Sequence, residues 1–432
     1  MAAKSGDRIR VITSDEIKEG ILMPNEETDS IVIKLDNGYN IGIDKKNVKE
    51  IKVIEKYKEK ETHSGKKPRK DSKKPTIAIL HTGGTIASKV DYRTGGVVAR
   101  FTPEEILDMF PELKDIANVK SRLIANMFSE DIRFKHYSLM CKAVEEEVKK
   151  GVDGIILTHG TDTLAYTSAA LSFALENINI PVILVGSQRS SDRGSSDAAV
   201  NLICAAKFIA KTDFVGVAIC MHESTSDNNC LIMPACKTRK LHTSRRDAFK
   251  IVNDKAIARI NYETRKIEII DNNHYKKSSD KKLNVKDKFE EKVGLLKAHP
   301  NMFPEQFEFF KNYNGLIIEG TGLGQAPVGT PNELAKIHAK NLEAIKKIIK
   351  NGCIVVMTSQ CIFGKVQMHV YSDAIDLVSA GVISGKDTLT ETAFIKLAWL
   401  LGNYKKDEVK ELITKNLKGE INERLLKDEF LG

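Results

Sequence analysis

The sequence predicts an α/β protein in which a small β-barrel precedes a body of two parallel-sheet domains. Three observations support this fold class. Short runs rich in Val and Ile, separated by turn residues, fill the first 56 residues, and a highly charged stretch follows them. From residue 75 onward, apolar strand-like runs alternate with amphipathic helical stretches. Fully apolar strands between helices are typical of a parallel sheet covered on both faces.

Residues 1–56 are expected to form the barrel. Their strand-like runs are "DRIRVI", "KEGILMP", "SIVIKLDNGYNIGI" and "VKEIKVI". The "DNGY" stretch predicts a hairpin, because Asn-Gly suits a two-residue turn that requires positive φ. Several short strands in roughly 50 residues fit a small barrel. Two roles remain open for it, a partner-binding module and an accessory packing module.

Residues 57–74 are expected to be a charged linker. The stretch 55–74 contains nine Lys and Arg residues, four acidic residues and hardly any apolar side chains. Such a composition cannot bury a core. A basic arm that touches RNA is the alternative interpretation.

The body is expected to consist of an α/β domain at 75–290, which carries the candidate catalytic threonines, and a second one at 291–432. "TIAIL", "GIILT", "PVILVG" and "VGVAIC" predict strands of the first domain, and residues 138–151 and 195–211 have the apolar periodicity of helices. A polar crossing at 271–291 then interrupts the pattern. "GLIIEG" and "CIVVMTSQ" resume it in the second domain.

Composition excludes several classes of protein. A chain of 432 residues is too long for one compact core. No apolar run reaches the roughly 18 residues of a membrane helix, and "MAAKSGDRIRV" lacks the apolar stretch of a secretory signal, so we expect a cytoplasmic protein that does not associate with membranes. Seven cysteines without a C-x-x-C pair give no indication of a metal site. The net charge of +9 permits an RNA partner, although a solvated lysine-rich surface explains it equally well.

Polar clusters follow the predicted strands where ligands bind in open α/β sheets, beyond the carboxyl ends. The clusters are "HTGGTIAS", "THGTDT", "GSQRSSDR" and, as a further candidate, "GTGLGQ". Thr85 follows a glycine turn, Thr161 and Asp162 lie at the next strand end, and Lys240 is one of the two lysines in "KTRKLHTSRRDAF". A threonine becomes a nucleophile when a neighbour takes its proton, and an Asp–Lys pair can arrange this. The alternative is that the threonines cap helices and that Lys240 is a surface charge.

Nucleotide binding by this chain has little support. No Gly-Lys-Ser/Thr follows the glycine turn, so the Walker A pattern is absent, and "GTGLGQ" does not complete a dinucleotide fingerprint. We therefore expect neither ATP nor NAD on this chain.

"TGGTIAS", followed about 75 residues later by "HGTDT", resembles the paired signature of the type I/II L-asparaginases. The resemblance continues through "KLHTS" and covers about 75–432. It implies that Thr85 attacks a side-chain amide carbonyl, and that Thr161, Asp162 and Lys240 handle the protons. An acyl-enzyme would form, ammonia would leave, and water would complete the hydrolysis.

The same resemblance implies roles for the substrate-binding residues. Ser129 and Glu130, in "FSED", would hold the amino and carboxyl groups of the substrate, and Asp162 would also hold its ammonium group. Backbone N–H groups at Gly84 and Gly160 would stabilise the oxyanion. The family has a tyrosine on a mobile loop after the first threonine. Tyr92 is the only nearby tyrosine, but its place in "SKVDYRTGG" does not match that position securely, so it is left out of the catalytic set.

The barrel, the linker, the body and "KLHTSRRDAF" together are similar to the D subunits of archaeal glutamyl-tRNA(Gln) amidotransferases. This resemblance implies a ligase complex that converts Glu-tRNA(Gln) to Gln-tRNA(Gln), in which this chain releases ammonia from glutamine or asparagine. The E subunit of the complex would carry ATP and magnesium and make most contacts with the tRNA. A homodimer of this chain would form part of a heterotetramer. A free-standing cytoplasmic L-asparaginase and a catalytically inactive binding module are the alternatives.

Overall fold

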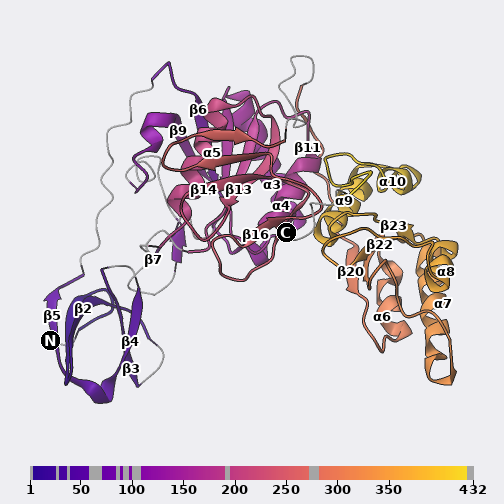
Figure 1. Cartoon of the computed structure of the whole chain (residues 1–432), viewed down its shortest axis with the longest axis horizontal. Helices are drawn as coiled ribbons and strands as arrows, with labels where there is room; N and C mark the ends of the chain where they lie inside the picture. Colours follow the sequence, from indigo (N-terminus) through magenta and orange to yellow (C-terminus); the bar gives the residue numbers. More distant parts are fainter. Residues whose placement is uncertain are drawn as a thin grey trace.

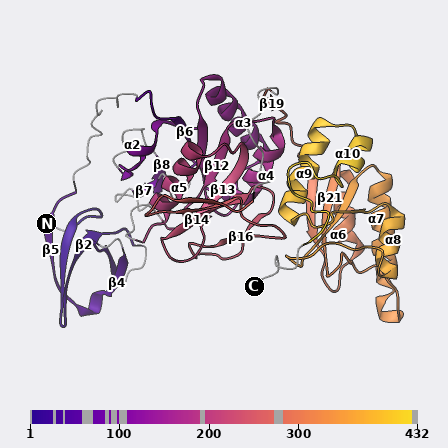
Figure 2. The same cartoon turned by 45° about the horizontal axis from the view of Figure 1, so that its top comes forward.

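The structure is a computed structural model that describes residues 3–25, 29–36, 39–57, 71–83, 88–90, 97–99, 109–189, 195–271 and 282–425. An N-terminal β-sheet lies at one end of the molecule, a large α/β unit lies in the middle, and a smaller α/β unit lies at the other end (Figures 1 and 2). None of the helices within these ranges is long and apolar enough to cross a membrane.

The N-terminal unit is a curled antiparallel sheet that contains the strands expected for the barrel. Its strands are β1 (Arg8–Thr13), β2 (Ile17–Leu22), β3 (Ser30–Lys34), β4 (Asn40–Asp44) and β5 (Val48–Glu55). They pair in the order β4-β3-β2-β1-β5, and within the described residues no ladder joins β4 to β5. The alternation of apolar residues along the strands buries Ile9, Val11 and Ile33 in a small core.

The central sheet has eight strands in the order β18-β17-β14-β13-β12-β10-β6-β9. They are β6 (Thr76–His81), β9 (Asn118–Leu123), β10 (Gly154–Thr158), β12 (Pro181–Val185), β13 (Gly216–His222), β14 (Asn229–Pro234), β17 (Ala258–Asn261) and β18 (Ile267–Ile269). The strands from β9 to β13 are parallel, as the sequence predicts. The remaining three are antiparallel. A connection as short as the one between β13 and β14 can only form a hairpin.

Helices cover both faces of the parallel strands. These helices are α2 (Leu113–Ile116), α3 (Phe134–Lys149), α4 (Leu164–Ala174) and α5 (Ala198–Lys211). Along β6, Ile77 and Ile79 point into the core formed with α2 and α5, whereas Ala78 and Leu80 point into the core formed with α3 and α4. Burial of both faces explains why the strand sequences are continuously apolar.

The C-terminal unit is a parallel four-stranded sheet in the order β20-β21-β22-β23. Its elements are β20 (Val293–Lys297), α6 (Pro304–Glu308), β21 (Gly315–Gly320), α7 (Ile337–Lys350), β22 (Ile354–Ser359), α8 (Ser372–Ala380), β23 (Ile383–Ser384), α9 (Thr390–Asn403) and α10 (Lys406–Leu412). Helix α9 joins this unit to the central one, because Trp399 stacks on Phe173 of α4 with ring centroids 5.4 Å apart. One hydrophobic core therefore spans the two α/β units.

Six small strands complete the described sheets. They are β7 (Ser88–Val90), which pairs with β8 (Val97–Ala99), β11 (Leu175–Glu176), which pairs with β19 (Asn284–Val285), and β15 (Thr238–Lys240), which pairs with β16 (Phe249–Ile251).

The register of the central sheet brings several strand ends to one edge. Thr158 at the end of β10 lies opposite both His81 of β6 and Val185 of β12, and His81 lies opposite Leu123 of β9. The segments that follow these four strands must therefore leave the sheet side by side.

Candidate active site

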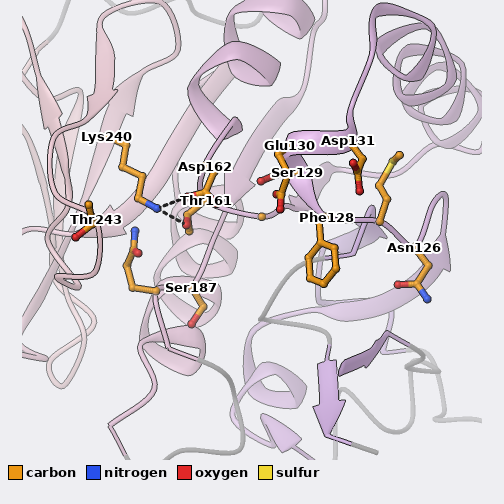
Figure 3. A pocket seen from close by; sticks show the side chains of 13 residues that line it. Asn126, Phe128, Ser129, Glu130, Asp131, Thr161, Asp162, Ser187, Lys240 and Thr243 are labelled. Carbon is orange, nitrogen blue, oxygen red and sulfur yellow. Dashed lines mark hydrogen bonds and ion pairs between the residues drawn. The ribbon is translucent and has the colours of Figure 1, made fainter. Parts of the chain in front are cut away.

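A cavity of about 560 Å³ opens at this edge of the central sheet (Figure 3). The segments after β9, β10 and β12 and the β15–β16 hairpin form its walls. The lining residues are Asn126, Met127, Phe128, Ser129, Glu130, Asp131, Gly160, Thr161, Asp162, Ser187, Gln188, Lys240 and Thr243. The cavity thus contains six of the residues that the sequence singled out, from three separate segments.

Lys240 connects two of these residues. It ends β15 (Thr238–Lys240), which pairs with β16 (Phe249–Ile251) in an antiparallel hairpin. Its Nζ donates to Thr161 Oγ1 at 2.8 Å and to Asp162 Oδ1 at 2.7 Å, as Figure 3 shows. The Lys240 side chain is 16% exposed and the Asp162 side chain is 66% exposed. The lysine is therefore held against a threonine hydroxyl at the edge of solvent, an arrangement that can move a proton to or from that hydroxyl.

Ser129 is fixed in the opposite wall. It begins a short 3-10 turn, Ser129–Asp131, and its carbonyl oxygen accepts a hydrogen bond from Thr163 Oγ1 at 2.6 Å. A Cβ atom at Gly160 would lie only 2.8 Å from both the Cβ and the Oγ of Ser129. Only glycine permits this close approach of the two segments.

The end of β6 lies against the segment that contains Met127, a residue of the cavity wall. Gly83 has φ of +108°, and a Cβ atom there would lie 2.4 Å from the carbonyl oxygen of Met127. The glycine thus places the end of β6 directly against a residue that lines the cavity. Gly84, Thr85 and Tyr92 lie outside the described residues.

Two buried histidines support the strand ends. His81 bonds through its ring nitrogens to Thr158 Oγ1 and Ser121 Oγ, both at 2.9 Å. His159 bonds to Thr167 Oγ1 at 2.8 Å and to the carbonyl oxygen of Gly160 at 2.7 Å. Burial lowers the pKa of each histidine to about 4. Both rings are therefore neutral near pH 7 and serve the site as hydrogen-bonding groups.

The charges in the cavity favour a positively charged group. Glu130, Asp131 and Asp162 provide three carboxylates, and Lys240 is the one basic residue among the lining residues described. An excess of negative charge favours the binding of an ammonium group. In the described part of the chain, no three His, Cys, Asp or Glu side chains are grouped as a metal ion would require.

Some lining residues were not predicted individually. Phe128 and Asp131 belong to "FSED", in which the sequence indicated only Ser129 and Glu130, and Asn126 lies just before it. Ser187 and Gln188 belong to "GSQRSSDR", which the sequence indicated only as a segment. The "GTGLGQ" segment (320–325) adds no residue to this cavity, because it follows β21 in the other α/β unit. The expectation that it joins the same crevice was wrong, since the two units have separate sheets.

An ion pair that the sequence did not indicate anchors the β15–β16 hairpin. Lys237, three residues before Lys240, donates from Nζ to Asp387 Oδ2 at 2.5 Å, and both side chains are 0% exposed. Asp387 also accepts from the backbone N–H of Asn422 at 3.0 Å. Two segments of the C-terminal part of the chain therefore fix the start of the strand that carries Lys240.

Comparisons with known proteins agree with this architecture. Three family models match the chain: GatD N-terminal domain at residues 3–54, Asparaginase, N-terminal at 76–275, and Glutaminase/Asparaginase C-terminal domain at 292–413. The D subunit of glutamyl-tRNA(Gln) amidotransferase from Pyrococcus furiosus is 46% identical, with 99% of this chain and 97% of the relative covered. The protein of the same name from Methanococcus maripaludis is 42% identical, with 97% and 98% covered.

Two solved structures share the fold of the body. The thermostable L-asparaginase from Thermococcus kodakarensis has a TM-score of 0.70 and 30% identity, and the match covers 81% of this chain and 100% of that one. L-asparaginase I from Vibrio cholerae has a TM-score of 0.69 and 28% identity, with 81% and 99% covered. The chain is thus similar in sequence to the D subunits over nearly its whole length, and similar in fold to L-asparaginases over most of it.

Proposed function

This chain belongs to the family of glutamyl-tRNA(Gln) amidotransferase D subunits, and on that premise we propose that it supplies ammonia to such a complex by hydrolysing the side-chain amide of glutamine or asparagine. The observation that carries the proposal is the bridge from Lys240 to Thr161 and Asp162 in the cavity. A lysine held against a threonine and a carboxylate is suited to proton transfer during the attack of a hydroxyl on an amide.

In the proposed reaction, the Thr85 hydroxyl attacks the amide carbonyl and the group formed by Thr161, Asp162 and Lys240 takes its proton. The same group returns a proton to the leaving nitrogen, so that ammonia departs and an acyl-enzyme remains. Water then attacks this ester and releases the acid. Backbone N–H groups at Gly84 and Gly160 stabilise the negative oxygen of each tetrahedral intermediate.

Substrate orientation follows from the charges in the cavity. Ser129 and Glu130 hold the amino and carboxyl groups of the substrate at one wall, and Asp162 adds a second contact to its ammonium group. Their proximity to Thr161 supports this orientation, because all four residues line the same cavity.

Membership of a family of subunits implies a partner chain. We propose that the partner is the E subunit of the complex, that it holds ATP and magnesium and makes most contacts with tRNA(Gln), and that a homodimer of this chain forms the centre of a heterotetramer. The cytoplasm is the proposed location, because the acceptor of the ammonia is a tRNA. The division of the chain into 1–56, 57–74, 75–290 and 291–432 is part of the same proposal, and the matched family models fall within its three folded parts.

The proposal is tested by measuring ammonia release from glutamine and asparagine by the purified chain, first alone and then with the partner subunit, ATP, magnesium and Glu-tRNA(Gln). We expect low activity alone and a sharp rise in the complete system. We also expect Thr85→Ala to lower hydrolysis at least about a thousandfold, since an activated nucleophile is lost.

Rapid hydrolysis of asparagine at a rate that does not change when the partner and the tRNA are added would instead identify a free-standing L-asparaginase. If Thr85→Ala retains most of the activity, the nucleophile is assigned incorrectly. If the wild-type chain releases no ammonia in either setting, the chain is an inactive binding module.

A further inference from the structure

One side chain in the cavity wall has an unused hydrogen-bonding group. Gln188 lies just beyond β12 and lines the cavity, and the Nε2 atom of its carboxamide is buried with no hydrogen-bond partner among the described residues. Within the described residues, the only hydrogen bond of Gln188 is made by its backbone. Burial of an unpaired donor is unfavourable, and a ligand in the cavity that accepted a hydrogen bond from Nε2 would remove this penalty.

The backbone around Gln188 is held firmly. Its N–H donates to Asp197 Oδ2 at 3.0 Å, and Ser187 Oγ donates to Asp197 Oδ1 at 2.9 Å. Asp197 is 0% exposed and accepts a further bond from Asn201 Nδ2 at 3.2 Å. These bonds fix the backbone of Gln188, so its side chain starts from a fixed position in the wall.

This turn lies at the end of the cavity that contains the catalytic lysine. A Cβ atom at Gly186 would lie 2.8 Å from Thr161 Cγ2, so the end of β12 touches the threonine to which Lys240 donates. Figure 3 shows Ser187 on the same side as the Lys240–Thr161 contact and across the cavity from Asp131. A substrate whose amino and carboxyl groups are held at Ser129 and Glu130 would thus direct its side-chain amide toward Thr161 and Gln188.

A second glutamine shows that an unpaired amide alone does not mark a site. Gln325 also has a buried Nε2 atom without a partner, but it closes the turn after β21 and does not line the cavity. What distinguishes Gln188 is its place in the cavity wall beside Thr161.

We propose that the Gln188 carboxamide recognises the side-chain amide of the substrate and distinguishes it from the carboxylic acid product. This inference rests on the proposed function. Nε2 donates to the carbonyl oxygen of the substrate, and Oε1 accepts from its NH₂ group. A carboxylate product has no N–H to offer, so one of its oxygens faces Oε1 and is repelled. A site built to pair with a polar group rejects an analogue that lacks it.

Gln188→Met tests this recognition, because methionine has a similar length and cannot form either bond. We expect KM for glutamine to rise at least about tenfold, while inhibition by glutamate changes by less than about threefold. The ratio of the product inhibition constant to KM therefore falls. Gln325→Met is the matched control, and it should leave both constants unchanged.

Equal increases in KM and in the product inhibition constant, or a lower kcat alone, would overturn the inference, and so would unchanged constants. If Gln188→Met does not fold, as judged by its Tm, Gln188→Glu decides. Gln188→Glu should raise KM for glutamine. It should also weaken inhibition by glutamate more than Gln188→Met does, because the introduced carboxylate repels the carboxylate of glutamate.

The proposed function is tested separately from the role of Gln188. It is wrong if the wild-type chain releases no ammonia from glutamine or asparagine in the complete system. Calorimetric titration of glutamine and glutamate into the wild-type and Gln188→Met chains then tests the recognition without catalysis. Binding of glutamine over glutamate that is lost in the variant supports the inference, and equal affinity of the wild type for both contradicts it.

Discussion

Two lysines three residues apart form ion pairs in very different surroundings. Lys237 pairs with Asp387 where both side chains are 0% exposed, whereas Lys240 pairs with Asp162 where the carboxylate is 66% exposed. The buried pair joins the β15–β16 hairpin to the C-terminal unit, and the solvated pair lines the cavity. A buried charge cannot lose its partner without a large free-energy penalty, whereas a charge near solvent can. The first pair is thus suited to hold the hairpin and the second to exchange protons.

The largest expected effect comes from removing the solvated lysine. Lys240→Met should lower kcat for amide hydrolysis at least about a thousandfold, roughly 4 kcal/mol of barrier, because the group proposed to take the proton of Thr85 loses its lysine. The unfolding transition should change little. Steady-state ammonia release, together with denaturant unfolding, measures both quantities.

Lys250→Met is the matched control for this change. Lys250 lies on the neighbouring strand β16, opposite Arg239, and does not line the cavity. If this control loses as much activity as Lys240→Met, the hairpin rather than the Lys240 amine is what the reaction needs.

The buried pair should respond in the opposite way. Asp387→Ala leaves the Lys237 ammonium group buried without its carboxylate, so we expect the free energy of unfolding to fall by about 3–5 kcal/mol. Urea denaturation measures this change. Asp407→Ala removes a carboxylate that is 98% exposed, and it should alter stability by no more than about 0.5 kcal/mol. Equal effects of the two substitutions would show that Asp387 is no anchor.

The two buried histidines should make the stability of the fold depend on pH. The pKa values of His81 and His159 are lowered to about 4 by burial, against about 6.5 in an unfolded chain. Between these values the unfolded state binds more protons, so stability rises with pH through this window and is fully present above pH 6.5 or so. Each histidine should contribute roughly 3 kcal/mol, which is lost as the pH falls toward 4.

The free energy of unfolding measured between pH 4 and pH 7 checks this expectation. His159→Gln should remove about half of the pH dependence in this window. Asp247 does not interfere, because the Arg245 guanidinium lowers its pKa to about 2 and its contribution is lost only at lower pH. A stability that stays flat from pH 4 to pH 7 would contradict the assignment of neutral, buried rings.

The smallest effect should come from replacing the buried pair as a whole. The double variant Lys237→Met with Asp387→Leu removes both charges together, and we expect its stability to lie within about 1 kcal/mol of the wild type or above it. Denaturation of the double variant beside Asp387→Ala separates the cost of an unpaired charge from the value of the pair. If the double variant is as unstable as Asp387→Ala, the hydrogen bond from Asn422 to Asp387 is the more important contact.

Local patterns in the sequence were sufficient to predict much of the fold and part of the site. Apolar runs of strand length, helical periodicity and turn residues predict the alternating elements of the body, because burial and backbone geometry act over short stretches. "HGTDT" places Thr161 and Asp162 at a strand end, and the structure confirms that Gly160, Thr161 and Asp162 line the cavity. The three antiparallel strands of the central sheet were missed, because pairing direction depends on connections and neighbours that periodicity does not reveal.

The sequence by itself determined the class of fold, the polar strand ends and the residue types available for chemistry. The resemblance had already singled out Lys240, and the structure shows its contact with Thr161, but only the tertiary structure decided that Lys237 is buried against Asp387. It also decided that Gln188 lines the cavity while Gln325 does not. The physical reason is that these contacts join residues far apart in the chain, for example 79 positions between Thr161 and Lys240. Such contacts depend on how strands and hairpins pack, whereas local propensities depend only on neighbours in the sequence.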